Sequence, residues 1–551
     1  MASTNQPLLH KTKSNCKFIF FTISISALVI SAVLLLPNQY QSNSKTSHLC
    51  SRALNPQSCQ DFVSEVTSDN SAIAITPQQD GTTLLQKFLI RQAHHMSRAI
   101  SQTRKLKNRM NAQIERGALA DCLHLIDLSI DLVLDSIRDL NNETSAMSRD
   151  NARAWLSGVL TNHVTCFDGL DSFEKQYLGE VIEDLIERAS ASLAVFAVAV
   201  SKLDHNEVDI PSFGQNYMPS WITKVERQLL QSTADAVAAD LTVAADGSGN
   251  YKTVAEAVAA APDKSKKRYV IYVKKGTYKE NVEVGKNKKN LMIIGDGMNN
   301  TIITGDLNVA DGATTFNSAT LAAVGEGFIM QDICIQNTAG PEKHQAVALR
   351  VGADKSVINR CRIDAYQDTL YTHSLRQFYR ESYVTGTVDF IFGNAAVVFQ
   401  KCKLVARKPM KSQKNMVTAQ GRTDPNQNTG TSIQDCEIIA SADLAPVKGS
   451  FPTYLGRPWK EYSRTVVMQS TIGDLIDPAG WAEWSGDFAL KTLYYGEYMN
   501  KGGGAGTSKR VNWTGYHVIT DAAEATKFTV KELIQGGDWL GSTGVTFTEG
   551  L

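Results

Sequence analysis

The sequence has no excess of charge of either sign. Its 551 residues include 56 Lys and Arg and 56 Asp and Glu. Proteins that bind nucleic acid through the phosphate backbone usually carry a clustered basic surplus. The composition therefore argues against a nucleic-acid partner and leaves room for an enzyme that acts on an acidic polymer.

Several motifs of common enzyme classes are also missing. We find no G-x-S-x-G nucleophile elbow, no Walker loop and no Rossmann fingerprint. His94 and His95 are adjacent and have no H-E-x-x-H or C-x-x-C motif beside them, which argues against a zinc site. Calcium-dependent lyase chemistry needs an acidic metal-binding cluster, and two spaced aspartates, Asp368 and Asp389, are too few for one.

One uncharged apolar run stands near the N-terminus. Residues 18–36 follow Lys11, Lys13 and Lys17, and a basic flank before an apolar run directs a chain into the secretory pathway. The run is long for a cleaved signal peptide and just long enough to span a bilayer. We interpret residues 1–45 as a signal peptide or signal anchor, both of which fit.

A secreted chain allows disulfides and N-glycans. Eight of the nine cysteines follow the apolar run, and an even number in an oxidising compartment favours disulfide pairing. Asn142, Asn299 and Asn512 each begin an Asn-x-Ser/Thr sequon, so we expect a glycoprotein, although such short patterns also arise by chance.

Residues 46–210 have a helical pattern. The segments 82–100, 119–140 and 177–200 carry apolar residues at three- and four-residue spacing, and short polar stretches such as residues 141–150 separate them. This pattern predicts an all-α domain, a four-helix bundle. Residues 211–230 are irregular and form the expected linker.

The remaining chain, residues 231–551, contains a loose repeat of short strands. The strands close on apolar residues at steps of 28, 21, 20, 34 and 34, namely Ile335, Ile363, Val384, Leu404, Ile438 and Ile472. A period of 20–28 residues, sometimes lengthened by a loop, is typical of coils in a parallel β-solenoid. The alternative is an antiparallel sandwich, which the scarcity of Asn-Gly and Asp-Gly turns disfavours.

The same period aligns a column of polar residues. Gln345, Gln367, Asp368 and Asp389 lie at steps of 22, 1 and 21, so they should stack on neighbouring coils. Repulsion between two close carboxylates should raise one pKa above the other, giving a proton donor beside an anion that serves as nucleophile or base. The glutamine amides can stabilise an oxyanion. A purely structural polar ladder explains the spacing equally well.

Arg457 lies in a Gly-Arg-Pro-Trp turn. Its guanidinium can bind a carboxylate in a bidentate manner and keep it ionised. Trp459, Trp481 and Trp484 lie close by in the sequence and offer flat faces for sugar rings, although tryptophans often belong to the core instead.

These segments resemble plant pectin methylesterases. The matching stretches occur in the family's order and together are highly specific: GTYKENV (276–282), TTFNSAT (314–320), QAVALR (345–350), YQDTLY (366–371), DFIFGNAAVVFQ (389–400) and LGRPWKEYSR (455–464). Residues 46–210 resemble, more loosely, the pectin methylesterase/invertase inhibitor domain that precedes the enzyme in larger family members. Residues 227–230 (RQLL) resemble the family's subtilisin-type processing site.

The resemblance implies a right-handed parallel β-helix catalytic domain and a role for each site residue. Asp389 would be the nucleophile and Asp368 the proton donor and later base. Gln345 and Gln367 would stabilise the oxyanion, Arg457 would hold Asp389, and Thr315 and Trp459 would contact substrate. The resemblance implies neither a metal nor an organic cofactor.

The resemblance also implies disulfides, partners and a location. The bridges would be Cys50–Cys59 and Cys122–Cys166 in the helical domain, and Cys334–Cys361 and Cys402–Cys436 in the catalytic domain, where Ser382 replaces a cysteine of some relatives. The partners would be methyl-esterified pectin, proteinaceous pectinesterase inhibitors and a subtilisin-type protease. The mature enzyme would be a monomer secreted to the plant cell wall.

Two other functions compete with this interpretation. A solenoid lyase or glycoside hydrolase would shorten the polymer, whereas an esterase releases methanol and leaves the chain length unchanged. A non-catalytic binder, whose active part is the helical domain, would have no need for the set of glutamines, aspartates and arginine.

Overall fold

The computed structural model describes residues 46–68, 81–110, 113–141, 146–199 and 238–551. The apolar run at 18–36, the sequon at Asn142 and the 227–230 segment lie outside these residues. Asn299 and Asn512 are both exposed. Among the described helices, none combines the length and apolar character that crossing a membrane requires.

The first described part is a bundle of long helices, which we call the helical domain. It confirms the predicted four-helix bundle and adds the shorter α2: α2 (Pro56–Ser68), α3 (Gly81–Lys107), α4 (Gln113–Asn141), α5 (Ala146–Gly169) and α6 (Ser172–Ala199). A reciprocal pair of hydrogen bonds between Asp171 and Glu174 forms a capping box at the start of α6. The bridges Cys50–Cys59 and Cys122–Cys166 are present, and the second ties α4 to α5.

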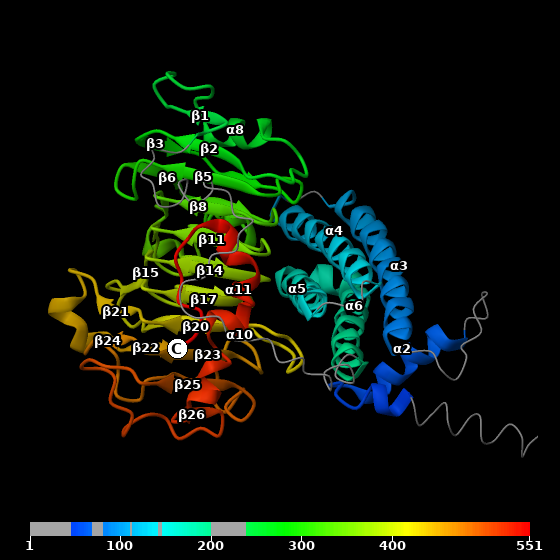
Figure 1. Ribbon diagram of the computed structural model, residues 1–551. Helices are drawn as coiled ribbons and strands as arrows, with labels where there is room; N and C mark the ends of the chain where they lie inside the picture. The colour runs from blue at the N-terminus through cyan, green and yellow to red at the C-terminus, as the bar shows by residue number, and fades with distance from the viewer. Residues whose placement is uncertain (1–45, 69–80, 111–112, 142–145, 200–237) are drawn as a thin grey trace, which may run out of the picture.

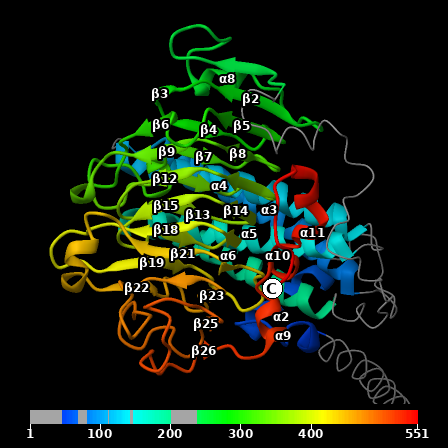
Figure 2. The same ribbon diagram turned by 60° about the vertical axis from the view of Figure 1, so that its left-hand side comes forward.

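The second part is a parallel β-helix, in which three strands make one coil (Figure 1, Figure 2). Its first sheet contains β1 (Leu241–Val243), β2 (Tyr269–Val273), β5 (Leu291–Gly295), β8 (Ile329–Gln331), β11 (Ser356–Asn359), β14 (Arg376–Arg380), β17 (Ala396–Gln400), β20 (Gly430–Gln434), β23 (Arg464–Met468), β25 (Tyr494–Tyr498) and β26 (Tyr516–Val518).

The second sheet contains β3 (Gly276–Lys279), β6 (Thr301–Gly305), β9 (Cys334–Asn337), β12 (Arg362–Asp364), β15 (Tyr383–Gly386), β18 (Lys403–Ala406), β21 (Glu437–Ala440) and β24 (Thr471–Ile472). The third contains β4 (Val282–Val284), β7 (Leu321–Ala323), β10 (Leu349–Val351), β13 (Leu370–Thr372), β16 (Ile391–Gly393), β19 (Asn415–Gln420) and β22 (Thr453–Gly456). The short helix α8 (Val254–Ala260) lies near the first coil. Three more short helices follow β26, namely α9 (Ala522–Thr526), α10 (Val530–Ile534) and α11 (Gly536–Trp539), and α10 and α11 pack on the outer face of the first sheet.

The repeat predicted from the sequence corresponds to the pairing of strands in the second sheet. The six apolar residues aligned from the sequence pair directly from strand to strand, in the order Ile335, Ile363, Val384, Leu404, Ile438 and Ile472. All six are buried in the core of the β-helix. The sandwich alternative is therefore wrong.

In six consecutive coils, the turn from the first sheet to the second uses one residue in the left-handed conformation. These residues have φ between 49° and 56°: Asp332, Arg360, Glu381, Lys401, Asp435 and Gln469. A small buried side chain follows the left-handed residue in most of these coils: Cys361, Ser382, Cys402, Cys436 and Ser470. The Ser382 hydroxyl accepts a hydrogen bond from the Cys361 amide, so this departure from some relatives still binds the neighbouring coil.

The structure contradicts the two disulfide bridges expected in the catalytic domain. Cys334, Cys361, Cys402 and Cys436 are buried free thiols in the structure. The Cys361 thiol donates to the carbonyl oxygen of Asn359 at 3.3 Å, and the Cys436 thiol donates to that of Gln434 at 3.3 Å. These hydrogen bonds satisfy the thiols within their own coils.

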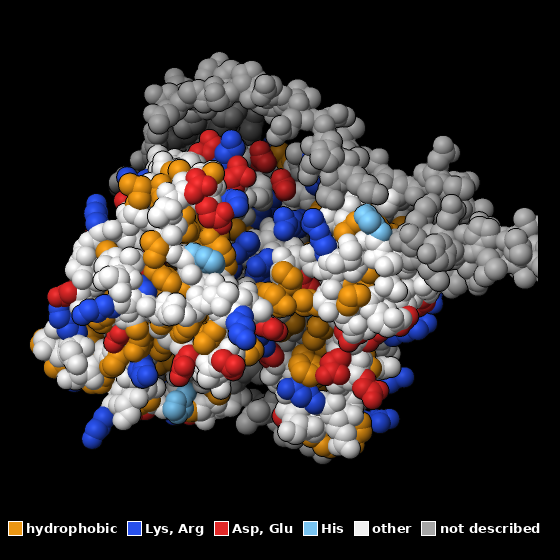
Figure 3. Space-filling model, turned by 90° about the horizontal axis from the view of Figure 1, so that it is seen from below, with side chains coloured by type: hydrophobic (Ala, Val, Ile, Leu, Met, Phe, Trp, Pro, Cys, Tyr) orange, Lys and Arg blue, Asp and Glu red, His pale blue; other side chains and the backbone are white. Residues whose placement is uncertain are grey.

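The helical domain packs against the third sheet, with α5 between the rest of the bundle and the β-helix (Figure 1). Residues in the strands of the third sheet, or just before one, belong to the same apolar cluster as the bundle core: Ala322, Val347, Tyr371, Phe392 and Ala419. Buried hydrogen bonds join the two parts, including Trp155 Nε1 to Asp354 (3.0 Å) and Arg376 to Asn151 (2.7 Å). Basic and acidic side chains are interspersed over the face seen from below (Figure 3), in keeping with the balanced composition.

We predict that Gly386→Ala disrupts the coil between the two aspartates. A Cβ at Gly386 would lie 2.2 Å from the Phe390 Cβ and 2.7 Å from the Tyr366 carbonyl oxygen, so the backbone must shift. We expect a loss of about 2 kcal/mol or more in stability, measured as a lower urea midpoint by tryptophan fluorescence. Gly449→Ala is the matched control, because its Cβ would meet no atom within 4 Å. Equal midpoints for the two variants would contradict the prediction.

Candidate active site

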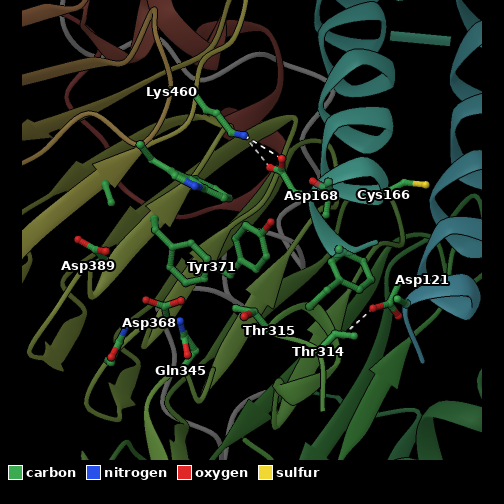
Figure 4. A pocket seen from close by; sticks show the side chains of 18 of the residues that line it. Asp121, Cys166, Asp168, Thr314, Thr315, Gln345, Asp368, Tyr371, Asp389 and Lys460 are labelled. Atoms are coloured by element: carbon green, nitrogen blue, oxygen red, sulfur yellow. Dashed lines mark hydrogen bonds and ion pairs between the residues drawn. The ribbon is translucent and has the colours of Figure 1, made fainter. Parts of the chain in front are cut away.

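Asp368 and Asp389 occupy equivalent turns of neighbouring coils, between the second sheet and the third. Both adopt the left-handed conformation, with φ of 61° and 51°, which aspartate tolerates better than most residues. The Asp368 amide donates to the carbonyl oxygen of Val388 at 3.1 Å, which fixes one turn directly on the other. Both side chains reach the same cleft of about 540 Å³ (Figure 4).

Arg457 holds Asp389 in a bidentate pair. Its Nε lies 2.8 Å from Asp389 Oδ1 and its Nη2 lies 2.7 Å from Oδ2. Arg457 follows β22, two coils beyond Asp389, so the pair spans the stack. The Trp484 ring lies 4.3 Å from the Arg457 guanidinium and restricts its position. This guanidinium favours the ionised form of Asp389.

The pKa values of Asp368 and Asp389 differ because Arg457 pairs with Asp389 alone. Burial raises the pKa of Asp368 well above its usual range, and the charge of Asp389 raises it further. Burial also raises the pKa of Asp389, but the hydrogen bonds and charge of Arg457 oppose that rise. Asp368 has no such bidentate partner in the described part of the chain, so the proton of the pair resides on Asp368.

The two glutamines lie beside the aspartates. Gln345 and Gln367 form a parallel bridge between adjacent coils, and both line the cleft. Thr315, at the start of a short 3-10 helix (Phe316–Ser318), lines it as well. The structure thus brings together Gln345, Gln367, Asp368, Asp389, Arg457, Thr315 and Trp459, as expected from the sequence.

Aromatic residues that the sequence analysis missed form one wall of the cleft. Tyr371 and Phe392 stack at 4.2 Å between ring centroids, and the Trp459 ring lies 6.0 Å from Phe392. Tyr371 and Phe392 lie 21 residues apart, and each comes three residues after an aspartate of the polar column. The repeat already contained this signal, because any residue at a fixed offset from both aspartates must stack in the same way.

Trp481 and Trp484 have different roles. Trp481 is 1% exposed and stacks on Tyr495 at 4.2 Å, so its suggested role as a face for sugar rings is wrong. Its indole N–H donates to Glu497 inside the core. Trp484 is 37% exposed and lines the cleft, so it remains available to a ligand.

The helical domain closes the other side of the cleft. Asp121 of α4 accepts hydrogen bonds from Thr314 (2.5 Å) and Asn317, and burial raises the pKa of Asp121 to about 6. Asp168 of α5 pairs with Lys460, with oxygen–nitrogen distances of 2.9 and 2.7 Å. No sequence pattern indicated these contacts, since each joins residues more than 190 positions apart.

The described residues offer no group of three or more His, Cys, Asp or Glu arranged to hold a metal ion. His95 instead lies 3.2 Å from Asp184 and 3.6 Å from Glu65 within the helical domain.

Comparison with known families assigns both parts of the chain. Residues 240–537 match the Pectinesterase family. The chain belongs to the pectinesterase family. It is, as such, a carboxylic ester hydrolase. Residues 44–195 match the family described as plant invertase/pectin methylesterase inhibitor.

Relatives match along the whole length. The chain is 63% identical over 556 residues to "Pectinesterase 2.1" of Solanum lycopersicum, covering all of both chains. It is 52% identical over 566 residues to "Pectinesterase/pectinesterase inhibitor 18" of Arabidopsis thaliana, again covering all of both.

A solved structure matches the β-helix. The pectin methylesterase from carrot is 64% identical with a TM-score of 0.57, and the match covers 57% of this chain and 99% of that chain. The matched share equals the share of the chain in residues 238–551. A relative consisting of this domain alone therefore folds, and the separated β-helix is a suitable protein for experiments.

We predict that Arg457→Gln shifts the pH profile of ester hydrolysis to higher pH. In the mechanism expected from the sequence, Asp389 attacks as an anion, so activity should be lost as pH falls through its pKa, and loss of the guanidinium raises that pKa. Arg457 also lowers the pKa of Asp368, the expected proton donor, so the alkaline limb should move upward too.

The test is kcat/KM against pH for residues 238–551. We expect the acid limb to rise by about one pH unit or more. Arg360→Gln is the control, because Arg360 forms an equally bidentate pair with Asp332 at a turn outside the cleft. An unchanged acid limb in Arg457→Gln would contradict the role given to Arg457.

Proposed function

We propose that the enzyme hydrolyses the methyl esters of homogalacturonan through a covalent acyl-enzyme intermediate on Asp389. One observation carries the proposal: Asp389 is held by Arg457 in a bidentate pair, while Asp368 lies one coil away without such a partner. The arrangement supplies an anion and a proton donor on the same face of the β-helix. These are the two groups that acyl transfer without a metal needs.

In the first half-reaction, an Asp389 oxygen attacks the carbonyl carbon of the ester. The oxyanion lies beside Gln345 and Gln367, whose amide N–H groups donate hydrogen bonds to it. The bond from carbon to methoxy oxygen then breaks, and methanol leaves with the proton of Asp368. The galacturonosyl unit is now joined to Asp389 as an anhydride.

The second half-reaction reverses the proton transfer. Asp368, now ionised, takes a proton from a water molecule as that water attacks the anhydride carbonyl. The bond to Asp389 breaks, Asp389 returns as a carboxylate, and the polymer leaves with a free carboxylic acid. Atoms and charges balance without a cofactor, and both aspartates end in their starting states.

We predict that Asp389→Asn in residues 238–551 lowers methanol release by at least about a thousandfold, since an amide is no nucleophile here. The measurement is methanol release from methyl-esterified pectin, together with polymer length. Asp435→Asn is the control, because Asp435 has the same left-handed conformation at an exposed turn.

Two outcomes would reject the proposal. Retained turnover in Asp389→Asn would remove the nucleophile assignment. Shortening of the polymer by the wild-type protein would favour a lyase or glycoside hydrolase instead.

We further propose that the chain is a secreted precursor for the plant cell wall. The helical domain closes one side of the cleft and lines it with Asp121 and Asp168, which restricts the approach of a polymer. A subtilisin-type protease would cut after residues 227–230 and free the mature, monomeric enzyme. The same cleft would then be the target of separate proteinaceous pectinesterase inhibitors.

We predict that the uncleaved chain releases methanol more slowly than residues 238–551 do at equal concentration. In a plant cell, the Arg227→Ala chain should remain uncleaved, be poorly secreted and release methanol slowly. Blotting shows how much of each form is secreted, and an assay of methanol release gives the activity of each form. Normal secretion of the short form from Arg227→Ala would contradict the processing site.

A further inference from the structure

The balanced overall charge conceals a basic segment in the first coils of the β-helix. Residues 261–290 contain ten Lys and Arg and three Asp and Glu, whereas residues 291–551 contain 24 and 26. We call two loops of this segment, residues 262–268 before β2 and residues 285–290 between β4 and β5, the basic edge. Together they carry seven of the ten cations: Lys264, Lys266, Lys267, Arg268, Lys286, Lys288 and Lys289.

The two loops of the basic edge lie side by side. The Lys264 amide donates to the carbonyl oxygen of Asn287 at 2.6 Å. The Asn290 side chain donates to the carbonyl oxygen of Ser265 at 2.9 Å. Because these hydrogen bonds join one loop to the other, the cations of both loops form one surface.

The charge of this surface is only partly balanced within the β-helix. Lys288 pairs with Asp263 at 2.9 Å, and Lys289 pairs with Glu326 at 3.0 Å. Three further lysines are exposed and form no ion pair within the part of the chain that the structure describes: Lys264, Lys266 and Lys267. The basic edge therefore keeps a positive charge that a polyanion can meet.

The helical domain supplies the carboxylates that pair with Lys286. Its Nζ lies 2.6 Å from Asp127 and 2.8 Å from Asp131, both on α4. Asp135 follows at the same spacing of four residues, so the three aspartates share one face of the helix. Burial raises the pKa of Asp135, and the charge of Lys289 is one of those that oppose the rise. A row of carboxylates thus already lies along the basic edge.

The basic edge is separate from the catalytic cleft. None of its cations is among the described residues that line the cleft. On α4, Asp121 at the cleft and Asp131 at Lys286 are about 15 Å apart along the helix. The two catalytic aspartates precede strands of the third sheet, whereas residues 285–290 follow one, so they lie at opposite edges of that sheet. A ligand on the basic edge would leave the reacting groups accessible.

We propose that the basic edge binds de-esterified stretches of the polymer and so holds the enzyme on a chain that it has already modified. The inference rests on the proposed function, since each hydrolysed ester leaves one carboxylate and a modified stretch is therefore a polyanion. Clustered cations attract a polyanion within the screening length of the salt. A methyl ester is neutral, so unmodified polymer gains nothing from this surface. In the precursor, the aspartates of α4 occupy part of it.

The direct test is binding of long, fully de-esterified polygalacturonate to residues 238–551, measured by calorimetry at low salt. We expect the triple variant Lys264→Gln, Lys266→Gln and Lys267→Gln to bind about tenfold more weakly, because three exposed ion pairs are lost. Added salt should weaken binding of the wild type more than binding of this variant, because salt screens ion pairs. Its urea midpoint should equal that of the wild type, because all three side chains are exposed.

The matched control removes three exposed lysines elsewhere on the β-helix domain, outside both the cleft and the basic edge: Lys501→Gln, Lys509→Gln and Lys531→Gln. We expect its affinity to change by less than about twofold. Equal losses in the two triple variants would show that net charge alone matters and would overturn the proposal. Unchanged affinity in the first variant would overturn it as well.

Two further outcomes have distinct meanings. Tighter binding of the basic edge to DNA than to polygalacturonate of equal charge would assign the surface to nucleic acid and overturn the proposal. If residues 238–551 released no methanol from pectin, the proposed function would fail. The affinity of the triple variant for polygalacturonate would still decide whether the basic edge binds a polyuronate.

Discussion

The register of the parallel strands is the constraint on which the site depends. Main-chain hydrogen bonds between coils fix each residue directly opposite its counterpart one turn away, as the column from Ile335 to Ile472 shows. The separation of one coil between Asp368 and Asp389 is therefore fixed by the backbone and not by the side chains themselves. Repulsion between the two carboxyl groups cannot push them apart, because doing so would break the ladder of buried strands on both sides. The fold thus maintains an arrangement that the side chains alone would avoid.

That forced proximity is useful only because the surroundings of the two carboxyl groups differ. Both are buried, and burial raises both pKa values. Arg457 breaks the symmetry, since its planar guanidinium can bond to both oxygens of Asp389 while it stacks near Trp484. Lysine could supply the charge but not the paired geometry. A single residue two coils away therefore decides which aspartate is the anion and which retains the proton.

The sequence predicted what repeats, and it missed what depends on contacts between distant segments. The six aligned apolar residues and the polar column were found because their period is the length of a coil. Helix α5 was not among the periodic segments, because it is buried on two sides, between the bundle and the third sheet, and so lacks a single apolar stripe. Trp481 and Trp484 lie three residues apart, yet only the fold separates a core ring from one that faces the cleft. The bridges expected in the catalytic domain are not formed, and the thiols of Cys361, Cys402 and Cys436 each donate to a carbonyl oxygen two residues earlier in the same coil.

The two parts of the chain share one apolar cluster, and this has a consequence for how the enzyme is controlled. Tyr371 and Phe392 contribute to the wall of the cleft and also to the core that the helical domain completes. The helical domain therefore covers apolar surface that a sugar polymer would otherwise meet, and its Asp168 neutralises Lys460. Polymer and helical domain cannot occupy the cleft together, so binding of either must weaken binding of the other by the same factor. In the proposed precursor, cutting the chain after the helical domain would not by itself open the site, because the buried contacts of Trp155 and Arg376 persist until the domain dissociates. Release would then depend on that dissociation as well as on proteolysis.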